Sequence, residues 1–292
     1  MRQWKKTTEY TGKEYILNGK PIPVSKFQNA FLYRGTSLYE VVRLIDGTPL
    51  FLSGHLRRFR QSARLSGMDG LPPDDALIRS MAALREANGI DNGNVKILYR
   101  VSGGKEDLLT YFDNHRYPTK TEYRKGIKTG MHHAIRKSPN IKFLNMELRS
   151  QVRETKRETG YYELILVNSG GCVTEGSRSN LFFVRKDACY TPPIEDVLPG
   201  ITREKIIRLC LASGITLRET PIRLEELTHY DAAFITGTSP MVLPVRSMDG
   251  VSYDPDHPVV RKLQKDYECL VRKDLEANSG WDKAFLQNSA SL

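Results

Sequence analysis

The chain has 292 residues, of which 44 are Lys or Arg and 34 are Asp or Glu, giving a formal net charge of +10. A hydrophobic fraction of 39% and a charged fraction of 27% are ordinary for a globular protein, and exclude global disorder, collagen-like repeats and membrane spanning. Because no apolar run approaches the roughly 18 residues of a membrane helix and no apolar segment follows the basic first residues, we expect a cytoplasmic protein of one large or two modest domains.

The cysteines and the basic excess point to no special partner. The four cysteines are far apart and form no C-x-x-C pair, which favours reduced thiols over a zinc site or a disulfide framework. The charges lie in mixed-sign runs such as 149–158 (RSQVRETKRE), which are typical of a solvated helix face. Since no recognised nucleic-acid-binding motif accompanies them, we expect no metal, no nucleic acid and no membrane partner.

The first third of the chain mixes strands and helices. The pairs Asn18-Gly19 and Asp46-Gly47 predict two hairpins, because these dipeptides favour tight turns between strands. A helix is predicted from a cap at Ser53 to Gly67, and another from Pro73 to Gly89. The predicted strands are 14–18, 22–24, 38–45, 49–52 and 95–101.

A polar, Pro-containing stretch at 113–126 (DNHRYPTKTEYRKG) is the predicted inter-domain connection. It divides the chain into domains 1–120 and 121–292. The second domain carries predicted helices at 145–159, at 200–212 and around 260–270, with apolar strands at 161–167 and 181–184. Strands outnumber what a βαβ alternation would give, so we expect an α+β architecture rather than a doubly wound sheet.

Three features suit an anionic ligand, although each is ambiguous alone. The segment 198–203 (LPGITR) places Gly200, Ile201 and Thr202 at a helix start, where unpaired amides attract phosphate. The segment 235–239 (ITGTS) offers hydroxyls and amides in a turn after a strand. Arg58, within a predicted helix, could make a bidentate contact with an anion. The alternative interpretations are a simple helix cap for 198–203, an ordinary turn for 235–239 and an exposed helix arginine for Arg58.

Six segments of the chain form an ordered pattern, namely 33–40 (YRGTSLYE), 49–58 (PLFLSGHLRR), 141–145 (IKFLN), 173–182 (VTEGSRSNLF), 198–203 (LPGITR) and 238–245 (TSPMVLPV). In this order they resemble the fold-type IV pyridoxal-phosphate enzymes, also called class IV aminotransferases. The resemblance covers the chain from about Tyr33 to Val245, and TEGSxSNLF followed by LPGITR is its most specific part.

The resemblance implies a fold, a cofactor and roles for particular residues. The fold is a smaller N-terminal α/β domain followed by a larger C-terminal pseudo-barrel domain that carries the cofactor lysine, assembled as a homodimer with the active site near the subunit interface. Lys142 matches the lysine that forms a Schiff base with pyridoxal 5′-phosphate, and Glu175 the carboxylate that meets the pyridine nitrogen. Leu198 matches the apolar residue under the ring. The implied phosphate ligands are Arg58, Ile201, Thr202, Thr238 and Ser239.

The implied activity is transfer of an amino group from an α-amino acid, of D-amino acid or branched-chain type, to a 2-oxo acid such as 2-oxoglutarate. Tyr39 and Arg34 are the implied substrate residues. The loop 102–108 lacks the arginine-plus-histidine pair that traps the substrate carboxylate in typical D-amino acid enzymes, which makes Arg100 and Lys105 alternatives to Arg34. Two other functions stay open, an aminodeoxychorismate lyase-like PLP lyase and a non-catalytic cofactor-binding protein.

Overall fold

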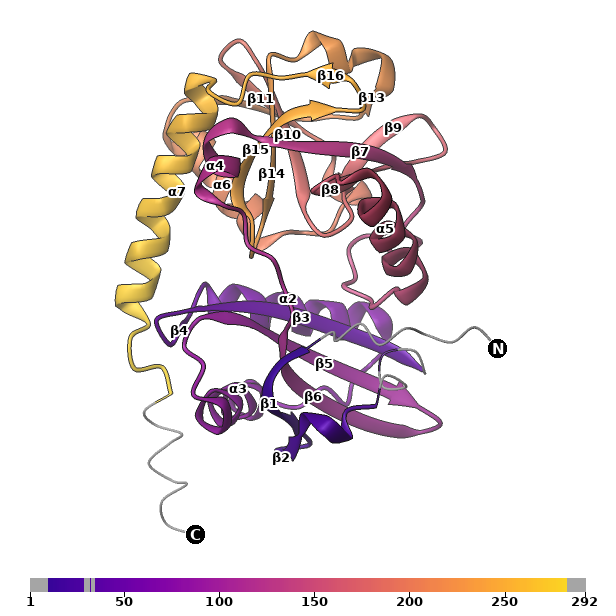
Figure 1. Cartoon of the computed structure of the whole chain (residues 1–292), viewed down its shortest axis with the longest axis vertical. Helices are drawn as coiled ribbons and strands as arrows, with labels where there is room; N and C mark the ends of the chain where they lie inside the picture. The colour runs from indigo at the N-terminus through magenta and orange to yellow at the C-terminus, as the bar shows by residue number, and fades with distance from the viewer. Residues whose placement is uncertain (1–9, 29–31, 33–34, 283–292) are drawn as a thin grey trace. The chain divides into compact units, whose positions relative to one another are not determined.

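The computed structural model describes residues 10–28, 32 and 35–282. The described chain forms two compact units, one made of residues up to 116 together with those from 274 onward, and the other of residues 117–273 (Figure 1). Each unit has its own sheet. Within the described residues, no helix is long and apolar enough to cross a membrane.

The first unit is built on a six-stranded antiparallel sheet in the order β2-β1-β6-β5-β3-β4. Its strands are β1 (Tyr10–Leu17), β2 (Lys20–Pro23), β3 (Thr36–Ile45), β4 (Thr48–Pro49), β5 (Gly93–Ser102) and β6 (Lys105–Asp113). The two predicted hairpin turns are confirmed, since β1 pairs with β2 across Asn18-Gly19 and β3 with β4 across Asp46-Gly47. All four turn residues have positive φ angles, which Asn, Asp and Gly tolerate best.

Helices α2 (Leu52–Ser66) and α3 (Asp74–Asn88) cover the same face of this sheet. Glu40 on β3 bonds to α2, and Thr110 on β6 accepts a hydrogen bond from Ser80 of α3. Both side chains share a face, because residues directly opposite in antiparallel strands point the same way and Ile97 of β5 stands opposite both of them. The other face therefore carries the residues of opposite parity, including Tyr39, Lys96 and Tyr111.

The predicted cap of α2 at Ser53 is wrong. The helix begins at Leu52, and its N-cap is Phe51 in the left-handed conformation. The Phe51 amide donates a 2.6 Å hydrogen bond to the carboxylate of Asp274, which comes from the far end of the chain. A distant acid thus satisfies an amide at the start of the helix. The predicted ends of α2 and α3 at Gly67 and Gly89 are confirmed, because both glycines adopt the positive φ of a helix C-cap.

The second unit contains a ten-stranded mixed sheet that curls into a half-barrel (Figure 1). Its order is β12-β11-β10-β14-β15-β7-β8-β9-β13, with β16 beside β15. The strands are β7 (Ile127–His133), β8 (Glu163–Val167), β9 (Cys172–Gly176), β10 (Asn180–Arg185), β11 (Ala188–Thr191), β12 (Thr216–Glu219), β13 (Ile222–Arg223), β14 (Ala232–Gly237), β15 (Met241–Met248) and β16 (Val251–Ser252). The expected α+β fold with a pseudo-barrel in its larger part is thereby confirmed.

Four helices belong wholly or mainly to the second unit, namely α4 (Lys120–Lys125), α5 (Met146–Thr159), α6 (Ile201–Ala212) and α7 (Pro258–Ala277). Helix α4 lies in the stretch that the sequence predicted as a plain connection. It is held by a capping box in which the Thr119 hydroxyl accepts from the Glu122 amide and the Glu122 carboxylate accepts from the Thr119 amide. Short 3-10 turns lie at Val24–Lys26, Ile194–Asp196 and Leu224–His229. All four cysteines are free thiols.

Candidate active site

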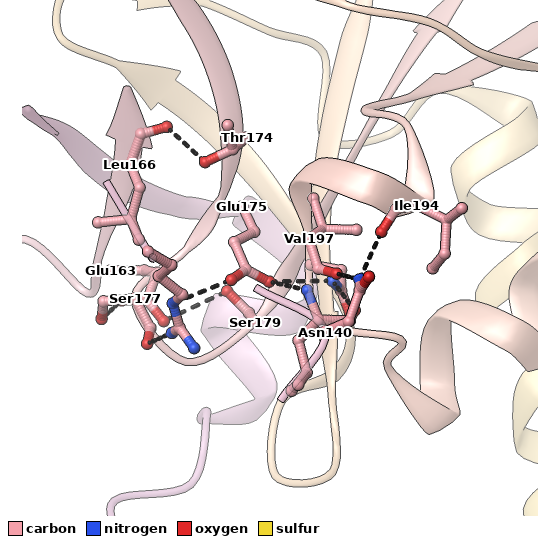
Figure 2. Close-up of polar contacts among 12 residues, drawn as sticks. Asn140, Glu163, Leu166, Thr174, Glu175, Ser177, Ser179, Ile194 and Val197 are labelled. Carbon is pink, nitrogen blue, oxygen red and sulfur yellow. Dashed lines mark hydrogen bonds and ion pairs between the residues drawn. The ribbon is translucent and has the colours of Figure 1, made fainter. Parts of the chain in front are cut away.

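A buried carboxylate lies at the centre of the candidate site in the second unit. Glu175, on β9, is only 2% exposed. Its Oε2 accepts hydrogen bonds from the Leu198 amide at 3.0 Å and the Asn180 side chain at 3.3 Å. Its Oε1 lies 3.0 Å from Nε of Arg136 in an ion pair (Figure 2). Two hydrogen-bond donors and one guanidinium, from three separate segments, therefore surround this carboxylate.

The turn after Glu175 explains the unusual TEGSxS pattern. A Cβ at position 176 would lie 2.0 Å from the Ser179 hydroxyl, so glycine is needed there. The hydroxyls of Ser177 and Ser179 donate to a second buried acid, Glu163 of β8, at 2.6 and 3.2 Å (Figure 2). Arg136 also donates to the Ser177 carbonyl at 2.7 Å. The motif serines thus fix the turn that presents Glu175.

A second network ties the segment before Lys142 to the loop that precedes Leu198. The Asn140 amide group donates to the carbonyls of Ile194 and Val197 at 2.7 and 2.8 Å (Figure 2). Lys142 itself is partly exposed and lies outside regular secondary structure. It is the central residue of a tight turn in which the Phe143 amide donates to the Ile141 carbonyl at 2.9 Å. The loop holding Leu198 and the turn holding Lys142 are therefore fastened together.

The start of α6 is built to leave its amides available. Its N-cap is Gly200, which has no side-chain cap, and the first amides of any helix lack partners within the helix. A Cβ at position 200 would lie 1.9 Å from Oδ1 of Asn180, so a glycine at this position lets the Asn180 side chain lie close to the backbone. The Thr202 hydroxyl, in the first turn, is 3.3 Å from the hydroxyl of Tyr267 on α7. The positive end of the helix dipole and a hydroxyl therefore meet at this point.

The other candidate hydroxyls lie in the turn between β14 and β15. Thr238 is partly exposed and Ser239 is buried. Helix α6 packs against β14, the strand that leads into this turn. The second unit thus contains Lys142, Glu175, Leu198, Ile201, Thr202, Thr238 and Ser239. Of these, Glu175 and Leu198 are joined by a direct hydrogen bond.

Arg58 lies in the first unit, on α2, and is strongly paired there. Its Nε and Nη2 donate to the two oxygens of Glu40, both at 2.7 Å, and Nδ1 of His55 lies 2.9 Å from the same carboxylate. Burial alone would raise the pKa of Glu40, but Arg58 and His55 outweigh it and hold that pKa well below its usual range. The alternative interpretation of Arg58 as an exposed helix arginine is therefore wrong, since Arg58 is buried.

Replacing Glu40 with Gln should destabilise the protein by about 3 kcal/mol at pH 7, because it leaves the buried Arg58 charge uncompensated. The Glu40 pKa is lowered in the folded state, so its contribution is complete above its unfolded pKa of about 4.3 and is lost as pH falls below that value. Urea unfolding of the wild type and of Glu40→Gln at pH 7 and at several pH values from 4 downward measures both effects. Equal stability of Glu40→Gln and the wild type at pH 7 would contradict this account.

The residues predicted to bind the substrate differ in their burial and in their contacts. Tyr39 is buried on β3 of the first unit, and Arg34 lies outside the described residues. Arg100 forms a buried ion pair with Asp107. Lys105 is 74% exposed at its side chain and 3.7 Å from the same carboxylate. The two alternatives to Arg34 thus share one acid as their partner.

Sequence reasoning missed four residues that shape the site, namely Arg136, Asn140, Asn180 and Tyr267. Asn180 could have been predicted from the sequence, because it is the asparagine of the TEGSxSN pattern. Arg136 and Asn140 act through contacts with residues 39 to 57 positions away, and Tyr267 through one 65 positions away. Nothing in their local sequence marks these contacts.

Comparison with known proteins places this geometry in a family. The family model described as amino-transferase class IV matches residues 37–248. The D-alanine aminotransferase of Bacillus licheniformis is 30% identical over 74% of this chain and 80% of its own length. The branched-chain-amino-acid aminotransferase of Pseudomonas aeruginosa is 31% identical over 86% of this chain and 89% of its own length. The solved branched-chain enzyme of Escherichia coli superposes with a TM-score of 0.79 at 26% identity, covering 93% of this chain and 98% of that one. The chain belongs to the class IV aminotransferases, a family of pyridoxal-phosphate-dependent transaminases.

Proposed function

We propose that this enzyme transfers an amino group from an α-amino acid, of D-amino acid or branched-chain type, to a 2-oxo acid such as 2-oxoglutarate. The observation that carries the proposal is the buried Glu175 carboxylate with its two hydrogen-bond donors and its ion pair with Arg136. The D-alanine and branched-chain relatives, at 30% and 31% identity, support both donor classes about equally. Homodimeric assembly and a cytoplasmic location stay predictions.

The described residues fit pyridoxal 5′-phosphate at both of its polar ends. A buried carboxylate that is ion-paired with Arg136 suits the protonated nitrogen of a pyridine ring. The uncapped start of α6, with Thr202 beside it, suits a phosphate dianion. We assign Ile201, Thr202, Thr238, Ser239 and Arg58 to the phosphate, and Leu198 to the face of the ring.

When bound, the cofactor supplies a ring that accepts the electron pair left as the substrate Cα–H bond breaks. Glu175 would lie against the ring nitrogen and favour its protonated form, with Arg136 as the ion-pair partner of Glu175. The Lys142 amine would hold the cofactor and, once the substrate amine displaces it, would move a proton between the substrate Cα and the C4′ carbon of the cofactor. Because the same amine would move the proton in either direction between these two carbons, the same residues would serve both half-reactions.

An absorbance spectrum of the purified enzyme, followed by a screen of amino donors with 2-oxoglutarate, tests the proposal. We expect a visible cofactor band that is lost on adding a productive donor, and glutamate formation with at least one D-amino acid or branched-chain L-amino acid. Release of pyruvate from aminodeoxychorismate without consumption of an oxo acid would instead identify a lyase. A visible band without turnover of any donor would identify a non-catalytic cofactor-binding protein.

Tyr267→Phe should weaken cofactor binding about 3- to 10-fold, because it removes one hydrogen bond to the Thr202 hydroxyl. Titration of the apoenzyme with pyridoxal 5′-phosphate, followed by absorbance, gives the dissociation constant. The matched control is Tyr253→Phe, whose hydroxyl donates to the Leu227 carbonyl in the apolar core of the same unit. An unchanged dissociation constant for Tyr267→Phe would rule out this role.

A further inference from the structure

One buried amide lies between the two parts of the site that are assigned to opposite ends of the cofactor. Asn180 is the first residue of β10 and is only 5% exposed. We propose that Asn180 is a positioning residue, whose side chain sets the distance between the Glu175 carboxylate and the start of α6 so that the ring nitrogen and the phosphate of one molecule can be bound together. This inference rests on the cofactor assignments made under the proposed function.

The amino end of the Asn180 side chain holds Glu175 against the loop before α6. Its Nδ2 lies 2.9 Å from the Leu198 carbonyl oxygen and 3.3 Å from Oε2 of Glu175. The Leu198 amide donates to the same Oε2 at 3.0 Å. An amide NH2 group has two hydrogens, one for each acceptor, whereas a carboxylate has none and a hydroxyl has one. The three residues therefore form a closed ring of hydrogen bonds that fixes the Glu175 carboxylate beside Leu198.

The carbonyl end of the same side chain faces the start of α6. Because a Cβ at position 200 would lie 1.9 Å from Oδ1 of Asn180, this oxygen lies directly against the backbone of the N-cap residue Gly200. The backbone amides that follow Gly200 are those assigned to the phosphate. An amide group is planar and rigid, so a single side chain separates Glu175 from the first turn of α6 by a fixed distance.

The sheet holds Asn180 independently of the loops that it contacts. Its backbone stands opposite Thr236 of β14, and β14 leads into the turn that contains Thr238 and Ser239. A side chain on a strand is placed more precisely than one on a loop. Asn180 is therefore a fixed reference point for Glu175, for the start of α6 and for the turn between β14 and β15.

An acid of the same size would not serve in place of this amide. Asn180→Asp would put a second buried carboxylate where Nδ2 now lies, 3.3 Å from Oε2 of Glu175. The charged groups on the surrounding elements are Arg136 in its ion pair with Glu175, Glu163 bonded to Ser177 and Ser179, Arg203 of α6 paired with Glu219, and Lys142 in the turn fastened to the loop of Leu198. Arg136 carries one positive charge and balances one carboxylate, so two adjacent carboxylates would keep a shared proton to a higher pH than an ordinary acid.

Titration of the apoenzyme with pyridoxal 5′-phosphate and with pyridoxal, which lacks the phosphate, tests the proposal. The ratio of the two dissociation constants, followed by absorbance, gives the gain from binding both ends at once. We expect Asn180→Ala to weaken binding of pyridoxal 5′-phosphate by roughly tenfold or more and that of pyridoxal by less than about threefold, because only the two-ended ligand depends on the distance between its sites. The matched control is Asn168→Asp in the turn between β8 and β9, where the side-chain oxygen accepts from the amides of Gly170 and Cys172. Because an acid keeps both bonds, this control should leave both constants unchanged.

Asn180→Asp supplies an independent readout, the pH dependence of stability. The acid pair would have a raised pKa in the folded state, and such a group lowers stability progressively as pH rises above its unfolded pKa of about 3.9. In urea unfolding of the apoenzyme, the midpoint of Asn180→Asp should therefore fall further behind the wild type between pH 5 and pH 8. Asn180→Ala adds no charge, so its midpoint should differ from the wild type by a similar amount at every pH.

These measurements separate positioning from a merely structural role. Equal weakening of pyridoxal 5′-phosphate and pyridoxal by Asn180→Ala, or no change in either constant, would overturn the proposal, as would a pH-independent difference between Asn180→Asp and the wild type. If Asn180→Ala does not fold, Asn180→Ser takes its place, because a single hydroxyl cannot serve both acceptors. A wild type that binds pyridoxal 5′-phosphate but transfers no amino group would instead disprove the proposed function, and the ratio of dissociation constants would still decide the role of Asn180.

Discussion

Lys142→Ala should lower transaminase activity by roughly 10³-fold or more, because the variant loses both the amine that holds the cofactor and the base that moves the Cα proton. Lys142 is the central residue of the turn that Asn140 fastens to the loop of Leu198. The visible band of the cofactor should disappear or shift as well. Steady-state rates with the best donor and the absorbance spectrum measure the two effects.

The matched control for this variant is Lys137→Ala, an exposed lysine five residues earlier in the same segment. It should keep the wild-type spectrum and rate. Circular dichroism melting of both variants separates loss of chemistry from loss of folding. A Lys142→Ala enzyme that is folded and turns over at the wild-type rate would remove Lys142 from the mechanism.

Glu175→Gln should lower kcat by roughly 10²- to 10⁴-fold, because a neutral amide does not keep the ring nitrogen protonated. The amide can still accept the hydrogen bonds of Leu198 and Asn180, so the local structure should persist. The affinity for the cofactor should fall less than kcat does. Steady-state kinetics at saturating cofactor, together with the cofactor dissociation constant, test this.

Glu163→Gln is the control for Glu175→Gln, because it is another buried acid on the neighbouring strand, bonded to Ser177 and Ser179 instead. Its kcat should stay within about threefold of the wild type, although its stability should fall because a charge-assisted bond is lost. Equal loss of kcat in the two variants would mean that the position of the turn, and not the charge of Glu175, determines kcat.

Local signals made much of the first unit predictable. The turns at Asn18-Gly19 and Asp46-Gly47 follow from residues that tolerate positive φ, and Gly67 ends α2 for the same reason. The start of α2 was mispredicted because the Phe51 amide bonds to Asp274, 223 positions away. No local pattern encodes such a contact.

In the candidate site, too, local motifs predicted some residues, whereas contacts between distant segments determine the others. Family motifs located Glu175 and Leu198, which the structure joins by a hydrogen bond. Arg136 lies in a loop without a motif, and only the fold brings it to Glu175. Long-range pairing therefore determines the residues that the sequence did not reveal.

The identity of the cofactor lysine is the central claim, and chemical reduction tests it most directly. Treatment of the holoenzyme with borohydride fixes the cofactor to its amine, and peptide mass mapping then locates it. We predict the pyridoxyl mass on the peptide that contains Lys142 and on no other peptide. Modification of another lysine instead, or no modified peptide from an enzyme with a visible cofactor band, would contradict the account.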